Sequence, residues 1–449
     1  MSTEAAPRPS VGDELELRID SLAFGGAGVA RSNGYVVFVE GAFPGDHVRA
    51  RVHHRKRAYA QARTLELLEP GPNRVEPLAQ HPGAPWQELA YATQLEIKQH
   101  QVDDSLRRIG HLEGFDLAPI VPAEQQWRYR NKLEYSFGTG SGGELTLGFH
   151  APGSWEQIIP IEDCLLASEA GNRARAAVLE WCRAQNLEAF DRRERTGFLR
   201  NLVVREGRRS GQIQLRLITA QGELDGGSLA AAVAADGLLW TRTDAVAETS
   251  SGGKTELLAG SFTLAERLCG LDLAISPEAF FQTNTEMAER LYAIAGEACE
   301  LKGWERVFDL FCGTGTIGLS IASRAGHVYG LEIDARAAAD AIENAARNDI
   351  ANASFFAGDV RLAMGDLRER AGRPDVVIVD PPRAGLSQKV VRRIIDTAPK
   401  RIVYVSCNPT TLAPNAAQLT EAGWRLERVA AVDMFPQTPH IECVALLTR

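Results

Sequence analysis

The sequence lacks several features that mark whole classes of proteins. No run of apolar residues approaches the ~18 that a membrane-spanning helix needs, and residues 1–10 are polar, without the apolar core of a secretory signal. The seven cysteines form no C-x-x-C pair and are odd in number, which argues against a disulfide framework and against a zinc site. We therefore expect a cytoplasmic protein with reduced thiols, no bound metal and no membrane partner.

Positive charge is also scarce overall, because the net charge is −9, which disfavours a surface that is basic throughout. The distribution is uneven, however. Residues 47–63 contain six Lys or Arg, three His and no acidic residue. This local run indicates a nucleic-acid contact in the first part of the chain, and a solvated hairpin without a partner is the alternative.

The 449 residues exceed what one hydrophobic core usually holds, so we expect three domains, over residues 1–70, 71–275 and 276–449. In the first, five short strands separated by glycine turns predict a small barrel of the OB type. Such barrels bind single-stranded nucleic acid through a basic groove and stacking aromatic side chains. Four aromatic residues are available there: Phe24, Tyr35, Phe38 and Tyr59.

The second domain is predicted to be α+β, with mostly antiparallel strands. A helix over residues 86–109 precedes them, with Leu95, Val102, Leu106 and Ile109 on one apolar stripe. Within this domain, residues 128–132 form a compact basic and aromatic group. We expect either a substrate contact there or simply a charged strand edge.

From residue 287 the pattern changes to alternating helices and strands, which is typical of a parallel sheet. Seven strands are predicted, and the last two follow each other without a helix, so we expect an antiparallel edge. The fold class is α/β, a seven-stranded Rossmann-like sheet. The strands are expected at residues 306–311, 328–333, 354–356, 376–379, 402–405, 425–432 and 443–447.

Polar residues follow several of these strands, and ligands bind outside the carboxyl ends of strands in such sheets. A glycine-rich turn, residues 312–315, opens a helix, and Glu332 ends the next strand, where it can accept from ribose hydroxyls. Asp359 and Asp380 end the following two strands. A nicotinamide cofactor fits the glycines and Glu332 but leaves Asp380-Pro-Pro unexplained. S-adenosylmethionine fits all of them, because carboxylates and carbonyl oxygens best stabilise its positive charge.

Cys407 ends a short apolar strand, and Glu442 begins the last one. Methylation at a nitrogen needs no cysteine, whereas methylation at carbon 5 of a pyrimidine needs a thiolate at carbon 6 and a general base. Cys407 suits the first role and Glu442 the second. A cysteine on a buried strand is more commonly a small hydrophobe, and we expect that of Cys312 and Cys443.

Three other functions fit parts of the pattern. An amino-directed RNA methyltransferase would use Asp380-Pro-Pro with Cys407 structural, but Arg383 stands where an aromatic residue is expected. A cytosine-5 enzyme is disfavoured because the proline-cysteine dipeptide is absent. A non-catalytic RNA-binding protein is disfavoured because Cys407 and Glu442 are both intact.

Several stretches together resemble the RNA uracil-5-methyltransferase family, and the opening barrel resembles its TRAM domain. The stretches are residues 280–284 (FFQTN), 309–315 (DLFCGTG), 380–385 (DPPRAG), 405–412 (VSCNPTTL) and 440–443 (HIEC). The resemblance implies that the protein methylates carbon 5 of a uridine in RNA. We expect 23S ribosomal RNA as the substrate, because the appended barrel resembles that branch of the family, with transfer RNA as the alternative, and we expect a monomer. The resemblance also implies that helix 86–109 packs on the catalytic domain. Its site residues would be Cys407 as nucleophile, Glu442 as base, and a cofactor pocket of Gln282, Phe311, Thr316, Glu332, Asp359 and Asp380.

The chain departs from this family at one place. Several relatives hold an iron–sulfur cluster through C-x5-C-x2-C and one later cysteine. The matching positions here are Val75, His81 and Ala84, and only Cys164 resembles the fourth ligand. One thiolate cannot hold a cluster that needs four ligands, so we expect no iron–sulfur centre.

Purified protein should therefore contain no stoichiometric iron and show no visible absorbance from a cluster, because three of the four ligand positions lack a thiolate. Metal analysis and an absorption spectrum of freshly prepared protein measure both. Iron at one cluster per chain would contradict this expectation.

Overall fold

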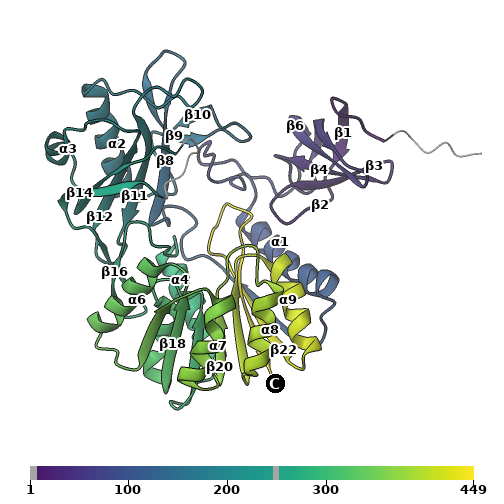
Figure 1. The fold of residues 1–449 in the computed structure, drawn as a ribbon. Helices are drawn as coiled ribbons and strands as arrows, with labels where there is room; N and C mark the ends of the chain where they lie inside the picture. The colour runs from purple at the N-terminus through teal and green to yellow at the C-terminus, as the bar shows by residue number, and fades with distance from the viewer. Residues whose placement is uncertain (1–7, 246–251) are drawn as a thin grey trace, which may run out of the picture.

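A computed structural model of the chain describes residues 8–245 and 252–449, so residues 1–7 of the predicted first domain and 246–251 of the second lie outside the described residues. Three main sheets are present. Figure 1 shows the N-terminal β structure and the middle part on opposite sides, above the C-terminal α/β part. The exact domain boundaries stay a prediction.

The N-terminal part is a six-stranded sheet whose interior is built from small apolar residues. The five predicted strands are present, and a two-residue strand, β2, was not predicted. Alternation of buried and exposed residues along β5 places Val48, Ala50 and Val52 inside. The strands are β1 (Glu14–Arg18), β2 (Ser21–Leu22), β3 (Gly28–Ser32), β4 (Tyr35–Glu40), β5 (His47–Arg55) and β6 (Tyr59–Glu69), in the order β1-β5-β6-β4-β3-β2.

The middle part is a seven-stranded sheet with α2 (Glu169–Ala184) and α3 (Gly226–Ala232) packed near its apolar face. Ile213, Leu215 and Leu217 share that face. The opposite side chains Gln214 and Arg216 are also buried, so this sheet is covered on both faces. The order is β10 (Ile158–Pro160), β9 (Leu145–His150), β8 (Lys132–Thr139), β11 (Leu199–Glu206), β12 (Ile213–Thr219), β13 (Gly237–Arg242), β14 (Lys254–Gly260).

The C-terminal sheet contains the seven predicted strands and an eighth. The expected antiparallel edge is wrong, because antiparallel β23 inserts between β21 and β22, and the edge strand is β7, which pairs in parallel with β22. The order is β19 (Ala353–Ala357), β18 (His327–Glu332), β17 (Arg306–Leu310), β20 (Val376–Val379), β21 (Arg401–Ser406), β23 (Glu442–Thr448), β22 (Arg425–Val432), β7 (Asp116–Val121).

Helices cover both faces of this sheet (Figure 1). One core contains residues of α4 (Thr285–Ala298), α5 (Thr316–Ile321) and the hairpin of β15 (Leu264–Leu268) and β16 (Leu271–Ile275). The other contains residues of α7 (Val360–Ala371), α8 (Gln388–Thr397) and α9 (Pro409–Glu421), while α6 (Ala335–Arg347) contacts β18 and β19. No helix in the described residues combines the length and the apolarity needed to cross a membrane.

The helix predicted over residues 86–109 begins later, as α1 (Tyr91–Asp104), and ends in a π-helical turn, Ser105–Ile109. It contacts β7, β22 and α9 of the C-terminal sheet. The predicted apolar stripe is only half correct. Val102 and Leu106 are buried, but Ile109 is 49% exposed, because the π turn shifts the helical phase. Polar Gln94 and Lys98 are buried instead.

A buried carboxylate joins the N-terminal sheet to the segment that follows it. Asp46 is fully buried and accepts from the backbone N–H groups of Phe43 (2.6 Å) and Gly71 (2.8 Å). The guanidinium of Arg74 also donates to both carboxylate oxygens, at 2.9 Å each. This one side chain therefore contributes several hydrogen bonds to the attachment of the barrel.

Replacing Asp46 by Ala should lower the free energy of opening of the barrel amides by about 3 kcal/mol, because it leaves buried N–H groups and a partly buried guanidinium without a partner. Hydrogen–deuterium exchange measures this opening. The control is Asp20→Ala, at an exposed aspartate, which should change it by less than about 0.5 kcal/mol. Equal effects of the two substitutions would contradict the assignment.

Candidate active site

Five acidic or sulfur-bearing side chains lie at one edge of the C-terminal sheet. Asp309 lies near the end of β17, Glu332 ends β18, Asp380 follows β20 and Cys407 follows β21. These strands are parallel, so their carboxyl ends meet at the same edge. Glu442 begins β23, and because β23 runs antiparallel, its start lies at that edge as well.

The strand register brings Cys407 and Glu442 together. β21 and β23 pair from Arg401 opposite Thr448 to Ser406 opposite Cys443. Continued by one residue, the same register sets Cys407 opposite Glu442. Residues directly opposite in an antiparallel pair point to the same face, with Cβ atoms about 5 Å apart. The sulfur and the carboxylate therefore face the same space.

The electrostatics of this pair agree with the register. The pKa of Cys407 is raised to about 11, by burial first and then by the Glu442 and Asp380 carboxylates, whereas Arg383 acts to lower it. The pKa of Glu442, whose side chain is almost fully buried, is raised well above its usual range by burial and by Asp380.

Two further carboxyls lie at the ends of the neighbouring strands: Asp309 is buried and Asp380 is half-buried. Burial raises the pKa of Asp380 to about 7, and it does the same for Asp309, with Asp380 and Glu332 adding to the effect on Asp309. Asp309 Oδ2 accepts from the Gly318 N–H at 2.9 Å, while its Oδ1 has no partner among the described residues. An uncompensated acidic site of this kind is suited to a bound cation.

The glycine-rich turn leaves room beside these carboxyls. Gly313 (φ 54°) and Gly315 (φ 80°) adopt the left-handed conformation, and Phe311 does so as well (φ 63°) although it is not a glycine. A Cβ on Gly313 would meet nothing within 4 Å, so the backbone there borders open space. The Gly313 N–H donates to Glu332 Oε2 at 2.9 Å, which fixes the predicted ribose acceptor against the turn.

The other predicted cofactor residues differ in whether their side chains already have a partner within the protein. Gln282 is buried and its side-chain amide makes no hydrogen bond within the described ranges, so it is free for a ligand. Thr316 instead donates its hydroxyl to the Tyr292 hydroxyl, at 3.3 Å. The carboxylate of Asp359 caps α7 and pairs with the Arg361 guanidinium, which lowers the pKa of Asp359. An adenine amino group would have to share that carboxylate with Arg361.

Two residues of the site were missed by sequence reasoning. Arg383 donates to His440 Nδ1 at 3.3 Å and lies close enough to Cys407 to affect its pKa. Its position directly after Asp380-Pro-Pro was the feature of the sequence that could have placed Arg383 in the site. Asn131 donates from its side-chain amide to the Gln282 carbonyl (2.9 Å) and to the Thr285 hydroxyl (2.9 Å). Part of the basic and aromatic group at 128–132 thus holds the Gln282 segment in place.

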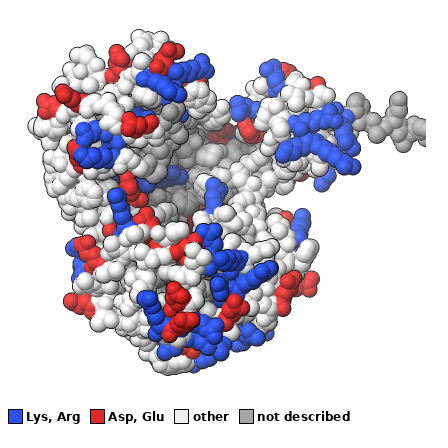
Figure 2. Space-filling view, viewed as in Figure 1, with Lys and Arg blue, Asp and Glu red and all other residues white. Residues whose placement is uncertain are grey.

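Only some of the residues expected to contact nucleic acid are exposed and without a partner inside the protein. On the barrel, Phe24 packs against the C-terminal core, whereas Phe38 and Tyr59 are half-buried and lie edge to face, 5.4 Å apart. Residues 55–57 (Arg-Lys-Arg) are exposed and make no ion pair within the described chain. Lys and Arg side chains gather on the barrel face seen in Figure 2. In the middle part, Arg128 pairs with Asp163 at 2.7 Å.

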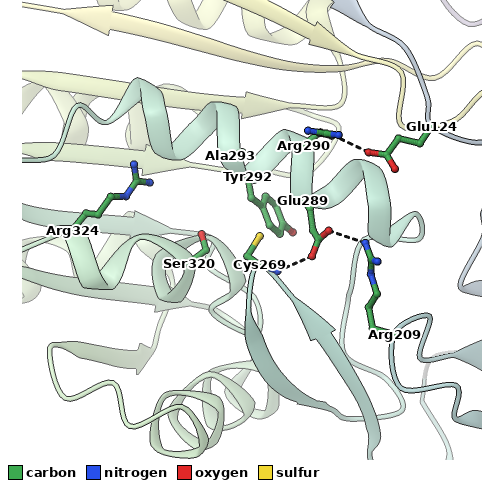
Figure 3. Close-up of a pocket in the computed structure, with 9 residues that line it drawn as sticks. All are labelled: Glu124, Arg209, Cys269, Glu289, Arg290, Tyr292, Ala293, Ser320 and Arg324. Atoms are coloured by element: carbon green, nitrogen blue, oxygen red, sulfur yellow. Dashed lines mark hydrogen bonds and ion pairs between the residues drawn. The ribbon is translucent and has the colours of Figure 1, made fainter.

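A separate cavity of about 560 Å³ lies beside α4 and does not contain the predicted catalytic pair. Four of its five charged side chains form two ion pairs, as Figure 3 shows: Arg209 pairs with Glu289 and Arg290 with Glu124, both at 2.9 Å. Burial raises the pKa of its one thiol, Cys269, to about 11. Its paired charges mark it as a groove at the packing interface of α4.

The four positions that correspond to cluster ligands in some relatives also come partly together. His81 Nε2 lies 3.2 Å from Cys164 Sγ, and both side chains are buried. Ala84 is buried and Val75 is 44% exposed, and neither side chain has an atom that can bind metal. In the part of the chain that the structure describes, no group of three or more His, Cys, Asp or Glu residues could hold a metal ion.

The strand order and the acids at the strand ends define a Rossmann-like methyltransferase fold. Residues 271–449 match the model of the tRNA (Uracil-5-)-methyltransferase family, and residues 8–65 match that of the TRAM domain. An uncharacterized RNA methyltransferase of Clostridium tetani is 36% identical, over 98% of this chain and 98% of the relative. One of Halalkalibacterium halodurans is also 36% identical, over 100% and 99%.

A solved structure resembles the chain over almost its whole length. It is the Pyrococcus abyssi tRNA (uracil-54, C5)-methyltransferase in complex with S-adenosyl-L-homocysteine, with 29% identity, a TM-score of 0.81, and coverage of 97% of this chain and 100% of that one. The chain belongs to the RNA uracil-5-methyltransferase family and is an S-adenosylmethionine-dependent methyltransferase of that family. The roles of its individual site residues stay predictions.

Glu442→Gln should move the alkylation profile of Cys407 to lower pH, because removing a neighbouring negative charge makes the thiolate easier to form. The rate of iodoacetamide labelling of the Cys407 peptide, followed by mass spectrometry across pH 7 to about pH 11, measures this shift. As a control, Glu427→Gln at the other end of the sheet should leave the profile unchanged. Identical profiles in the wild type and Glu442→Gln would contradict the proximity of the two groups.

Proposed function

We propose that the protein transfers a methyl group to carbon 5 of a uridine in RNA, with Cys407 as the nucleophile and Glu442 as the general base. The observation that carries this proposal is the register of β21 and β23, whose last pair, Ser406 with Cys443, sets Cys407 opposite Glu442 when it is continued by one residue. A pyrimidine is flat, and this reaction needs a sulfur and a carboxylate within reach of one ring. The target base must leave its stack to reach such a site.

Cys407 opens the reaction because carbon 5 of uridine is a poor nucleophile. The thiolate adds to carbon 6, and the electron pair of the C5–C6 double bond moves into an enolate. Carbon 5 then bears the electron density that forms the new carbon–carbon bond, while the methyl–sulfur bond of the donor would break and leave its electron pair on that sulfur. The sulfur must first lose its proton, which the neighbouring carboxylates oppose and Arg383 favours.

Glu442 completes the reaction by taking the proton from carbon 5. The electron pair of that C–H bond re-forms the C5–C6 double bond, the C6–S bond breaks, and its electron pair returns to sulfur. The raised pKa of Glu442 makes its carboxylate a stronger base than an exposed glutamate. Its burial also keeps water from the covalent intermediate.

S-adenosylmethionine, when bound, supplies an electrophilic methyl group and a positive charge. The residues that would hold it are Gln282, Phe311, Thr316, Glu332, Asp359 and Asp380. Support comes from the unpaired Asp309 Oδ1, the free amide of Gln282 and the open space beside Gly313. A cation beside these carboxyls also lowers the pKa of the Cys407 thiol, since opposite charge favours the thiolate.

An iron–sulfur cluster has no part in this proposal, because Val75 and Ala84 offer no ligand atom. The His81–Cys164 contact then links the segment after the barrel to the middle part.

The RNA substrate has two candidates. The sequence favours 23S ribosomal RNA because of the appended barrel. That barrel does not discriminate, however, since the Pyrococcus abyssi transfer RNA enzyme matches 97% of this chain, barrel included. Transfer RNA is therefore the second candidate, and mapping 5-methyluridine in total RNA from a deletion strain separates them. Monomeric state and cytoplasmic location stay predictions from the sequence.

Cys407→Ala should abolish methyl transfer, with a loss of about 10⁴-fold or more, because no thiolate can activate carbon 5. Binding of S-adenosylmethionine, measured by calorimetry, should stay within about twofold of the wild type. Glu442→Gln should instead accumulate a covalent protein–RNA species that survives denaturing electrophoresis. Unmodified total RNA from the deletion strain serves as substrate.

The matched control for Cys407→Ala is Cys443→Ala, a buried cysteine in the core on the other face of β23. It should keep methyl transfer, even if it lowers stability. Retained activity in Cys407→Ala, or absence of the covalent species in Glu442→Gln when the wild type is active, would overturn the proposed mechanism.

A further inference from the structure

The segment between β22 and β23, residues 433–441, delivers Glu442 to the site and is held along its length by distant parts of the chain. Four successive carbonyls accept hydrogen bonds from four different segments. Asn284 donates to the Met434 carbonyl (2.9 Å), Lys98 to Phe435 (3.1 Å), Tyr129 to Pro436 (3.1 Å) and the Trp86 N–H to Gln437 (2.9 Å). Such dense anchoring is unusual for a connection between two strands, which ordinarily runs over the surface.

An ion pair lies at the start of this segment. Lys98 Nζ is 2.6 Å from Asp433 Oδ1, and both side chains are 0% exposed. The Tyr91 hydroxyl donates to the other oxygen, Oδ2, at 2.7 Å. The pair joins helix α1 to residues 335 positions later in the sequence.

One helical turn before Lys98, Gln94 forms two hydrogen bonds with the same segment. Its side chain donates to Gln437 Oε1 (2.7 Å) and accepts from the Gln437 N–H (3.0 Å). Gln437 has a φ of 66°, a left-handed conformation that is costly for a residue with a side chain. The surrounding contacts must hold this backbone in place.

The polar face of α1 is not explained by stability alone. Buried ion pairs contribute little more to stability than apolar residues of the same size, and often less. An apolar stripe on this face would anchor α1 to the sheet equally well. What a directional polar face adds is a fixed position for the segment that it contacts.

We propose that Lys98 and Asp433 are positioning residues for the proton abstraction: through residues 433–441 they fix the carboxylate of Glu442 opposite Cys407. Helix α1 thereby sets the geometry of a base that it does not touch. This inference rests on the proposed function, because it assigns a role to the general base.

Lys98→Met and Asp433→Asn should lower turnover between about 10- and 100-fold, the usual effect of displacing a reacting group by about 1 Å. The distinguishing readout is the fraction of protein found as covalent RNA species, again with total RNA from the deletion strain. It should rise severalfold, because addition by Cys407 persists while elimination slows. Affinity for S-adenosylmethionine should change by less than about twofold. A purely structural role would lower binding, addition and elimination together.

Tyr91→Phe is the milder variant if the buried pair cannot be broken without unfolding. It removes one donor to Asp433 and leaves the ring in place, and it should raise the covalent fraction to a smaller extent. The matched control is Lys400→Met, which breaks a solvent-exposed lysine pair with Asp375 and should behave as the wild type. Wild-type kinetics in a folded Lys98→Met or Tyr91→Phe would overturn the inference.

The proposed function and this inference fail in different ways. If the wild type transfers no methyl group and Glu442→Gln traps no RNA, the proposed function is wrong. If the wild type is active and Glu442→Gln traps RNA, but Lys98→Met and Tyr91→Phe show no change in the covalent fraction, only the positioning role is wrong.

Discussion

The hydrogen-bonded ladder between β21 and β23 is the contact on which the site depends. Each strand alone carries one of the two proposed reactive residues at its tip, and the ladder, whose last pair is Ser406 with Cys443, sets the tips side by side. Because the two strands are antiparallel, one strand ends where the other begins, so a single edge of the sheet receives both a sulfur and a carboxylate. β23 is central in the sheet, with β21 and β22 on either side, and this protects the arrangement from fraying.

The same edge concentrates negative charge. Asp309 and Glu442 are buried and Asp380 is half-buried, and removal from solvent raises the pKa of each carboxyl. Such a site is costly in the protein alone and is relieved by a cation. The acidity that suppresses the Cys407 thiolate in the protein alone is thus the same acidity that favours binding of a sulfonium. In the proposed mechanism, the bound sulfonium would therefore also favour the thiolate of Cys407.

The local features of the site were predictable from the sequence, and its long-range geometry was not. The strand ends at Asp380 and Cys407 could be predicted because each residue follows a short apolar strand. Asn408-Pro409 marks the start of a helix. The position of β23 between β21 and β22 could not be predicted from the sequence, because strand order depends on pairing across the sheet. The burial of Lys98 could not be predicted either. A polar helix face is normally exposed to solvent, and the partner of Lys98, Asp433, is far away in the sequence. Strand β7, which was assigned to the middle domain, joins the catalytic sheet for the same reason.

The central claim is that Cys407 bonds to carbon 6 of a uridine, and the most direct test is the mass of its peptide after reaction with RNA that contains 5-fluorouridine. Fluorine at carbon 5 cannot be removed as a proton, so the wild-type protein should stop as a methylated adduct on the sulfur of Cys407. A peptide mass raised by one methylated fluorouridine nucleotide at this residue is the predicted result. An unmodified Cys407 after methyl transfer, or an adduct on another cysteine, would contradict the account.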